Sequence, residues 1–304
     1  MQLVLLGTSA SLPTRQRGLT SAALVRGGEI FLFDCGEGTQ MQFQRAGLKP
    51  GKLSRIFISH FHGDHFYGLV GLLTSLQMGG REKALNIYGP EGLRKYLTFM
   101  QQFSQFTFEY DVAVHEVQES SGDKVWDLGE YFVKAKPLEH RMFVLGFRVE
   151  EKPKPGKFNV AEAERLGIPD GPLRRLLQKG ETVVLPDGKE ISPSQVLGPE
   201  RAGKNIAFCL DTTPCRNAIE LARDADLLVH EGTFDEAQTE WANTTGHSTV
   251  EQAATIALEA GAKKLVLTHI SARYKENDEQ RLLTQAKKVF PNTVLGRDLM
   301  RIEV

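Results

Sequence analysis

The chain has 304 residues, with 37 lysines and arginines against 38 aspartates and glutamates, and a formal net charge of −1. Hydrophobic residues make up 41% and charged residues 25%, a globular composition that excludes a disordered chain, a collagen-like repeat and a coiled coil. No apolar run approaches the roughly 20 residues that a membrane helix needs, and the N-terminus lacks a signal-peptide pattern. With only three cysteines, we expect a cytoplasmic protein without a disulfide scaffold.

In chain order, short apolar strands alternate with helical patterns. The first half predicts strands at residues 3–6, 22–25, 30–33, 56–59, 86–88, 112–117, 131–135 and 144–149, with helices at 37–46, 67–77 and 91–102. The second half predicts strands at 206–210, 227–229 and 265–268, with helices at 216–223, 249–260 and 278–289. This alternation predicts an α/β fold of two facing layers, with the sheets inside and the helices outside.

Residues 150–204 interrupt the alternation. Seven prolines fall in this segment, and residues 152–179 contain seven basic side chains against three acidic ones. A core element rarely contains so many prolines, so we expect an inserted arm with a small helix at 173–178 and a hairpin around 186–188. A disordered surface loop is the alternative. The local positive charge favours a functional arm that contacts an anionic partner.

Three histidines and an aspartate lie within six residues, in His60-Phe61-His62-Gly63-Asp64-His65, directly after the predicted strand 56–59. Residues two apart at a strand end face the same side, so His60 and His62 should converge. Gly63 would then let the chain turn, so that Asp64 and His65 face a second point. Neutral imidazoles with a carboxylate are typical zinc ligands, and manganese or iron are alternatives. Three further candidates follow predicted strands: His140, Asp211 and His269.

The spacing His60-x-His62-x-Asp64-His65 resembles the signature of the metallo-β-lactamase superfamily. Within that superfamily the chain resembles the ribonuclease Z family, in its short form, over nearly its whole length. The motifs that carry this resemblance are Gly7-Thr8 with Pro13, Asp34-Cys35-Gly36-Glu37-Gly38-Thr39, His230-Glu231-Gly232-Thr233-Phe234 and Gly246-His247-Ser248-Thr249. Gly18 departs from the pattern, because the family usually has asparagine there. The resemblance implies one domain over residues 1–304, a four-layer αββα sandwich in which residues 150–204 form a flexible arm that binds tRNA.

The resemblance also implies an activity and a site. The enzyme would be a zinc-dependent endoribonuclease that removes 3′ trailers from precursor tRNA and leaves a 3′-hydroxyl on the tRNA. It would hold two Zn²⁺ per subunit, or Mn²⁺ or another divalent metal in their place. It would act as a homodimer in which one subunit's arm presents the tRNA to the other's site. The implied ligands are His60, His62 and His140 for one ion, Asp64, His65 and His269 for the other, and Asp211 as the bridge.

The resemblance further implies that Asp64 is the general base, that His247 protonates the departing 3′ oxygen, and that Glu231 orients His247. A structural place for His247 stays open, because Ser248 and Glu251 have the spacing of a capping box at the start of a helix.

Other residues near the motifs have two readings. Asp34 could brace a ligand histidine or cap a turn, and His230 could lie behind a ligand. We expect His115 and the three cysteines to be structural.

Two other functions are compatible with the same residues. One is a hydrolase of the same superfamily with another substrate: a thioester, a lactone or a small phosphodiester. The basic arm argues against this alternative, because such substrates need no long arm. The other is a non-catalytic RNA-binding module. The main argument against it is that all seven ligand positions are filled.

Overall fold

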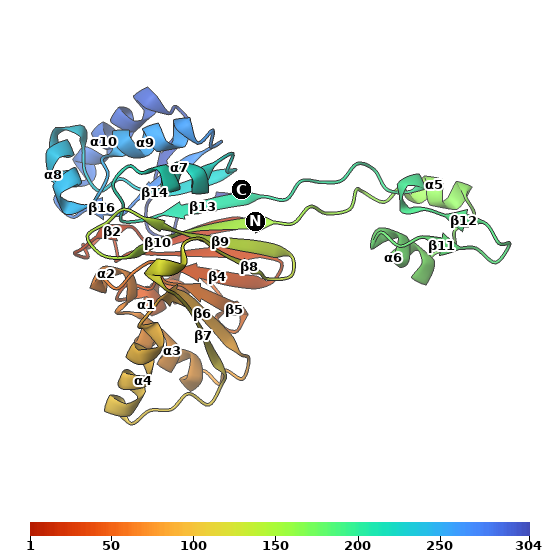
Figure 1. The fold of residues 1–304 in the computed structure, drawn as a ribbon, viewed down its shortest axis with the longest axis horizontal. Helices are drawn as coiled ribbons and strands as arrows, with labels where there is room; N and C mark the ends of the chain where they lie inside the picture. The colour runs from red at the N-terminus through yellow and green to blue at the C-terminus, as the bar shows by residue number, and fades with distance from the viewer.

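Two seven-stranded sheets lie face to face in a computed structural model that describes all residues 1–304. Helices cover the outer face of each sheet, and a long arm projects from one edge (Figure 1). The sheet orders are β18-β1-β3-β4-β5-β6-β7 and β17-β15-β14-β13-β10-β9-β8. This is the four-layer αββα sandwich that the sequence predicts. None of the helices combines the length and the apolar character that crossing a bilayer requires.

The first sheet takes its strands from the first half of the chain and from the C-terminus. They are β1 (Gln2–Gly7), β3 (Ser21–Arg26), β4 (Glu29–Phe33), β5 (Leu53–Phe57), β6 (Leu85–Pro90), β7 (Val112–Val117) and β18 (Arg301–Glu303). Strands β4 to β7 run parallel, and the others pair antiparallel. Three helices pack on its outer face, namely α1 (Thr39–Arg45), α3 (Leu69–Met78) and α4 (Leu93–Ser104). The one-turn helix α2 (Gly63–Phe66) follows β5.

The second sheet comes from the second half of the chain. Its strands are β8 (Lys124–Asp127), β9 (Tyr131–Leu138), β10 (Val144–Glu151), β13 (Asn205–Cys209), β14 (Leu227–Glu231), β15 (Leu265–Thr268) and β17 (Thr293–Leu295). Strands β13, β14, β15 and β17 run parallel. The outer helices are α7 (Arg216–Ala222), α9 (Val250–Glu259) and α10 (Glu276–Val289), and α8 (Thr239–Thr245) lies at one end. The short pair β2 (Ser9–Ala10) and β16 (Ile270–Ser271) links the two halves.

The alternation of side chains along the strands explains the layers. Leu3 and Leu5 of β1 face the core between the two sheets, whereas Val4 faces the core under the helices. In the central core, the rings of Phe33 and Phe208, one from each sheet, stack with centroids 3.8 Å apart. Because successive side chains of a strand point to opposite faces, each sheet has one face for the other sheet and one for its helices.

Residues 150–204 leave the sandwich as a stalk that carries a small folded head (Figure 1). Backbone hydrogen bonds of 2.9 Å between Lys154 and Arg201 join the two chains of the stalk. The head contains α5 (Val160–Arg165), α6 (Pro172–Gln178) and the hairpin of β11 (Val183–Val184) and β12 (Glu190–Ile191). The predicted small helix and hairpin are therefore present, and α5 is an addition. The buried core of the head consists of Ala163, Ile168, Leu177, Val183, Leu185, Ile191 and Val196.

Glycines set two element boundaries that the sequence misplaced. Helix α1 begins at Thr39 instead of residue 37, because Gly38 before it has a left-handed backbone with φ of 83°. The helix predicted at 67–77 begins at Leu69. Just before it, Gly68 approaches the chain so closely that a Cβ there would lie 2.1 Å from the Gly36 carbonyl oxygen.

Candidate metal centre

The candidate residues meet where several strands end, at the edge of the sandwich that carries α2, β2 and β16 (Figure 1). A cavity of about 850 Å³ opens there. Its lining includes His62, Asp64, His140, Asp211 and His247, so residues from both halves of the chain share one space. The arm leaves the sandwich at the opposite edge.

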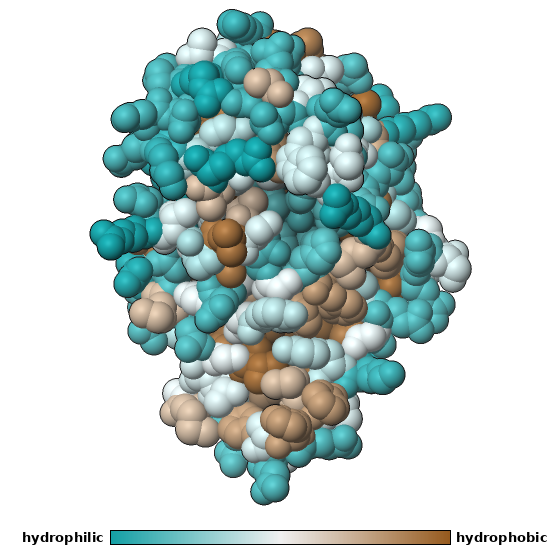
Figure 2. All heavy atoms as spheres, turned by 90° about the vertical axis from the view of Figure 1, so that its left-hand side faces the viewer, coloured by the Kyte–Doolittle hydropathy of each residue, from teal (hydrophilic) through white to brown (hydrophobic).

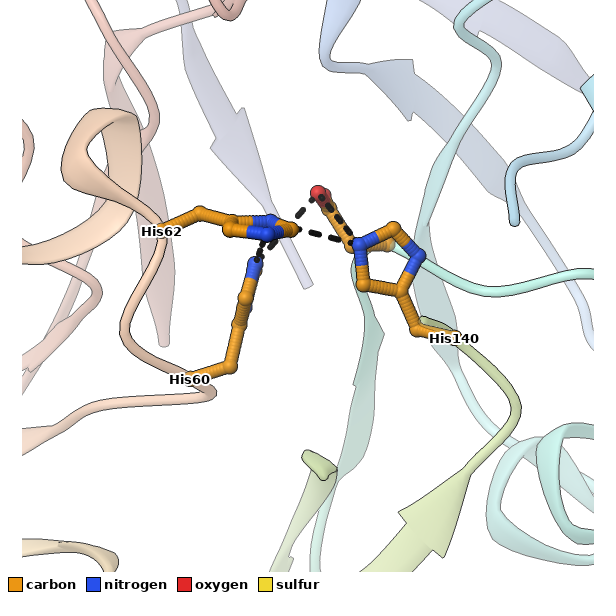
Figure 3. Close-up of side chains that lie close together, drawn as sticks. His60, His62 and His140 are labelled. Atoms are coloured by element: carbon orange, nitrogen blue, oxygen red, sulfur yellow. Dashed lines mark hydrogen bonds and ion pairs between the residues drawn. The ribbon is translucent and has the colours of Figure 1, made fainter. Parts of the chain in front are cut away.

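Three histidines and a carboxylate form the first cluster. His60 Nε2 lies 3.0 Å from His62 Nδ1, and His140 Nε2 lies 3.3 Å from the same atom. Asp211 Oδ2 is 3.5 Å from His60 Nε2 and 3.9 Å from His140 Nε2. The three rings point to one position, His60 and His62 from one side and His140 from the other (Figure 3).

The second cluster lies on the other side of Asp211. His65 Nε2 and His269 Nε2 are 3.2 Å apart, and Asp64 Oδ2 is 3.3 Å from His269 Nε2. Asp211 Oδ1 is 3.1 Å from His65 Nε2 and 3.2 Å from His269 Nε2. Each carboxylate oxygen of Asp211 therefore faces a different cluster, which is the geometry that a bridging ligand needs.

Four residues at this edge have a left-handed backbone. Ser11, Asp34, Asp211 and His269 have φ of 57°, 56°, 50° and 57°, and each comes one or two residues after a strand ends. Such values are uncommon for residues other than glycine. Here they turn the chain sharply as it leaves the sheet, so that side chains from different strands meet.

The convergence of His60 and His62 has a different cause from the one predicted. Strand β5 ends at Phe57, so both histidines lie in the following loop and strand alternation does not align them. Gly63 does not make a left-handed turn either, because it is the first residue of α2. A Cβ at Gly63 would lie 2.5 Å from the Tyr67 ring. Glycine at this position leaves room for the Tyr67 ring.

Hydrogen bonds fix the orientation of four of the histidine rings. His65 Nδ1–H donates to Asp34 (2.7 Å), and His140 Nδ1–H donates to the Gly246 carbonyl (2.6 Å). His60 Nδ1 is 2.9 Å from the Ser59 hydroxyl, and His269 Nδ1 is 2.9 Å from the Thr233 hydroxyl. Both hydroxyls donate their own hydrogen to a carboxylate, so they accept from these rings. In the neutral form each Nε2 is then a lone pair directed at the clusters, as in ligands that a second residue holds in place. Burial opposes the charged form of His65, but the carboxylates of Asp211 and Asp34 raise its pKa well above the usual value, so an ion bound there would displace a proton.

Asp34 supports both clusters, which answers a question that the sequence left open. One of its oxygens accepts the Ser59 backbone N–H at 2.7 Å. The other accepts the Ser59 hydroxyl at 2.8 Å and His65 Nδ1–H. Asp34 therefore holds His65 directly and His60 through Ser59. The roles of Ser59 and Thr233 were missed, although both residues lie inside the motifs.

Burial and charge make the site suited to a cation. Burial lowers the pKa of His60, His62 and His140, so these rings are neutral at pH 7, which is the form that binds a metal. Asp211 Oδ1 is buried and lies within 3.2 Å of two histidine nitrogens, yet it accepts no well-directed hydrogen bond. Converging lone pairs around an unsatisfied carboxylate oxygen fit a bound divalent ion. The donor set of imidazoles and carboxylates matches zinc.

His247 pairs with Glu231 beside the clusters. His247 Nδ1 lies 2.9 Å from Glu231 Oε1, and Glu231 is fully buried. Burial alone would lower the pKa of His247, but the charge and hydrogen bond of Glu231 outweigh it and raise that pKa to about 9. The predicted capping box is displaced by one residue, because Thr249 and Gln252 form it and Ser248 donates to the Thr212 carbonyl instead.

The remaining candidates lie outside the site. His230 points away from it, because neighbouring residues of β14 face opposite sides, and neither of its ring nitrogens contacts a candidate ligand. His115 stacks on Tyr88 and bonds Asn86, and the three cysteines are buried and unpaired, as expected. One contact was not foreseen: the Ser11 backbone N–H donates to Asp64 Oδ2 at 2.7 Å. No sequence signal marks a backbone donor.

Comparisons with known proteins identify the family and the fold. The model of the beta-lactamase superfamily domain matches residues 188–270, and that of the anti-Pycsar protein Apyc1 matches residues 1–121. Among curated relatives, ribonuclease Z of Acaryochloris marina is 45% identical and that of Methanosarcina acetivorans 44%. Both alignments cover the whole of this chain and 98% of the relative.

Solved structures give the same result. The short form of human tRNase Z superposes with a TM-score of 0.75 at 30% identity, covering 100% of this chain and 99% of the human one. A metallo-beta-lactamase fold protein from Bacillus subtilis has a TM-score of 0.69 at 19% identity, which supports the fold alone. The identity to relatives aligned over their full length is high enough to decide membership. The chain therefore belongs to the ribonuclease Z family and has the metallo-β-lactamase fold.

Proposed function

We propose that this chain, an endoribonuclease by family, uses two zinc ions to cut the 3′ trailer from precursor tRNA and leaves a 3′-hydroxyl on the tRNA. The observation that carries the proposal is the position of Asp211, whose two oxygens face two separate groups of imidazole and carboxylate ligands. The proposed ligands are His60, His62 and His140 for one ion, Asp64, His65 and His269 for the other, and Asp211 for both. Mn²⁺ could take the place of zinc in these positions.

Two bound ions would activate the attacking water and stabilise charge on the phosphodiester oxygens. Asp64 would orient the water and accept its proton, because the Ser11 N–H holds one of its oxygens and it lines the cavity.

His247 is the proposed general acid. Its pKa of about 9 keeps it protonated at neutral pH, and it lines the cavity beside the clusters. It can therefore give a proton to the 3′ oxygen that leaves with the tRNA. Glu231 would hold the ring in place and keep it charged. Two arginines of the cavity wall, Arg141 and Arg273, supply positive charge for the phosphates on either side of the cut.

The arm is the proposed contact for the tRNA body. The structure pairs four of its basic residues with carboxylates, Lys152 with Asp127, Lys154 with Glu151, Arg165 with Glu162 and Lys204 with Asp226. Of the charges left for a partner, two lie on or next to α6. Arg175 and Lys179 are exposed there, and neither is in an ion pair. Such side chains bind a phosphate backbone by charge and shape, without reading bases.

The direction of the arm supports a homodimer. The stalk leaves the sandwich at the edge opposite the cavity, so the head points away from the site of its own subunit (Figure 1). A tRNA held by the head could reach the cavity of a second copy. We accordingly propose that one subunit's arm serves the other's site, in the cytoplasm, where the three free cysteines would stay reduced. The flexibility of the arm stays a prediction.

The decisive experiment uses 5′-labelled precursor tRNA with a 3′ extension and zinc-loaded protein, with the products sized to one nucleotide. We expect one cut that chelation abolishes, and a product that poly(A) polymerase can extend because it ends in a 3′-hydroxyl. Metal analysis should give two ions per chain. Loss of cleavage in Asp64→Ala, with the fold intact, would support the general base, and normal turnover would contradict it.

Asp211 has a matched control in this chain. Asp224 is also an aspartate with a left-handed backbone, φ of 52° against 50°, but it lies on the surface away from the clusters. Asp211→Asn should lose bound metal and cleavage, whereas Asp224→Asn should keep both. A metal-free protein that binds tRNA would point to the non-catalytic module. Hydrolysis of thioesters, lactones or small phosphodiesters without a cut in precursor tRNA would point to the other hydrolases.

A further inference from the structure

Two large aromatic side chains are exposed in the wall of the cavity. Tyr67 is 64% exposed and Trp241 is 51% exposed, and both line the space that contains the metal clusters. Figure 2 shows this face of the molecule, on which polar residues dominate the upper part and apolar residues gather in the lower part. Large aromatic rings are usually buried, so two exposed rings beside a reaction centre indicate a surface that a ligand covers.

Tyr67 lies close to the histidine motif. It directly follows α2, and its ring lies over Gly63, where a Cβ would be only 2.5 Å from a ring carbon. The neighbouring Phe66 ring lies 5.3 Å away at 51°. The Tyr67 ring therefore sits against the backbone between His62 and Asp64, and most of its surface is open to the cavity.

Trp241 approaches from the other wall. It belongs to α8, which ends at Gly246, and the carbonyl of that glycine accepts the hydrogen bond from His140 Nδ1–H. His247 is the next residue. In Figure 1, α8 and α2 lie on opposite sides of the β2–β16 pair. The helices next to the two residues thus lie on opposite sides of this pair. In the chain, Tyr67 closely follows the proposed base Asp64, and Trp241 precedes the proposed acid His247.

We propose that Trp241 and Tyr67 are stacking platforms for the two unpaired nucleobases that flank the scissile phosphate. The assignment rests on the proposed function and deepens it. His247 would protonate the 3′ oxygen of the nucleotide on the 5′ side, so the base of that nucleotide belongs on Trp241, close to His247. Tyr67, beside Asp64, takes the first base of the trailer. Stacking accepts any base, so these platforms hold the strand in line without selecting its sequence.

The test combines ring removal with base removal. Trp241→Leu and Tyr67→Leu are compared with the ring-retaining controls Trp241→Phe and Tyr67→Phe. The substrates are intact precursor tRNA, the same tRNA abasic at the nucleotide 5′ of the cut, and the same tRNA abasic at the first trailer nucleotide. On the intact substrate each leucine variant should lower kcat/KM on the order of tenfold, and each phenylalanine variant should lose clearly less than its leucine counterpart.

The pairing of variant and substrate decides the assignment. The loss of kcat/KM in Trp241→Leu should vanish on the tRNA that is abasic at the nucleotide 5′ of the cut. The loss of kcat/KM in Tyr67→Leu should vanish on the tRNA that is abasic at the first trailer nucleotide. The metal content of both variants should be unchanged. A loss of equal size on all three substrates would overturn the proposal, as would leucine variants that equal wild type on intact tRNA. A wild-type protein that cuts no precursor would instead overturn the proposed function.

A measurement without catalysis gives a second check. The chain has two tryptophans, and Trp126→Phe leaves Trp241 as the only one. In chelator-treated protein, intact precursor tRNA should quench the fluorescence of Trp241 more strongly than tRNA abasic 5′ of the cut. Equal quenching by both RNAs would contradict the stacking on Trp241.

Discussion

Removing two charges from the head of the arm should change how tRNA binding depends on salt. The perturbation is the double variant Arg175→Ala with Lys179→Ala. Both side chains are exposed on or next to α6 and are free of ion pairs, so their loss leaves no buried carboxylate unpaired. The core of the head does not include them, which means that its fold should persist.

The size of the effect follows from counterion release. Each phosphate contact contributes about 0.9 to the slope of log affinity against log salt concentration, so two lost contacts reduce the slope by about 1.8. Between 50 and 200 mM salt, a fourfold change, the advantage of wild type over the variant should therefore shrink by about 12-fold. The two binding curves should approach each other at high salt.

The assay is fluorescence-anisotropy titration of labelled precursor tRNA at four salt concentrations, with chelated protein so that no cleavage occurs. A matched control removes the same number of charges from the stalk, as Lys152→Ala with Lys154→Ala. These lysines are held by Asp127 and Glu151, so the control should keep the wild-type slope. An unchanged slope in the Arg175 and Lys179 variant would refute the proposed phosphate contacts of the arm.

Three further predictions concern single side chains. Thr233→Val keeps the shape of the side chain but removes the hydroxyl that bonds His269 Nδ1. Zinc affinity, measured by competition with a chelator, should fall about 10- to 100-fold. Unchanged affinity would contradict the supporting role of Thr233. Glu231→Gln should move the alkaline limb of the rate–pH profile to lower pH by about 1–3 units. The pKa of the general acid His247 falls without the Glu231 charge, so its active protonated form is lost at a lower pH. A limb that stays in place would exclude His247 as the acid. Leu177→Ala should destabilise the head by about 2–5 kcal/mol, so that limited proteolysis cuts the arm faster while the sandwich stays intact; an arm as resistant as wild type would contradict the independence of its core.

The sequence predicted the sandwich because short apolar strands alternate with helical patterns along most of the chain. The strand at 112–117 and the one at 265–268 were placed to the residue. The elements that were missed are short or weakly patterned. Helix α8 contains three threonines and an asparagine, which are poor helix formers, and it is formed by its packing in the fold. Strand β18 has only three residues and depends on β1 for its pairing.

The site was predictable as a list of residues but not as a geometry. All seven proposed ligands come together in two groups, as the family resemblance implied. The reason given for the first group was wrong, because β5 ends before His60. The contact of the Ser11 backbone with Asp64 could not be foreseen, since a backbone N–H carries no residue-specific signal. The hydrogen bonds of Thr233 depend on a left-handed turn that sequence patterns do not reveal.

The left-handed backbone at Ser11, Asp34, Asp211 and His269 has a consequence for the history of the chain. Each such residue costs on the order of 1 kcal/mol that glycine would avoid, so together they consume a sizeable part of the 5–15 kcal/mol that typically keeps a protein folded. A lineage that no longer needed the pocket could relieve this cost with glycine at Ser11, whereas glycine at Asp34 or Asp211 would also remove a carboxylate that holds the neighbouring histidines. This chain has glycine at none of the four positions, so the turns at this edge keep their cost in stability.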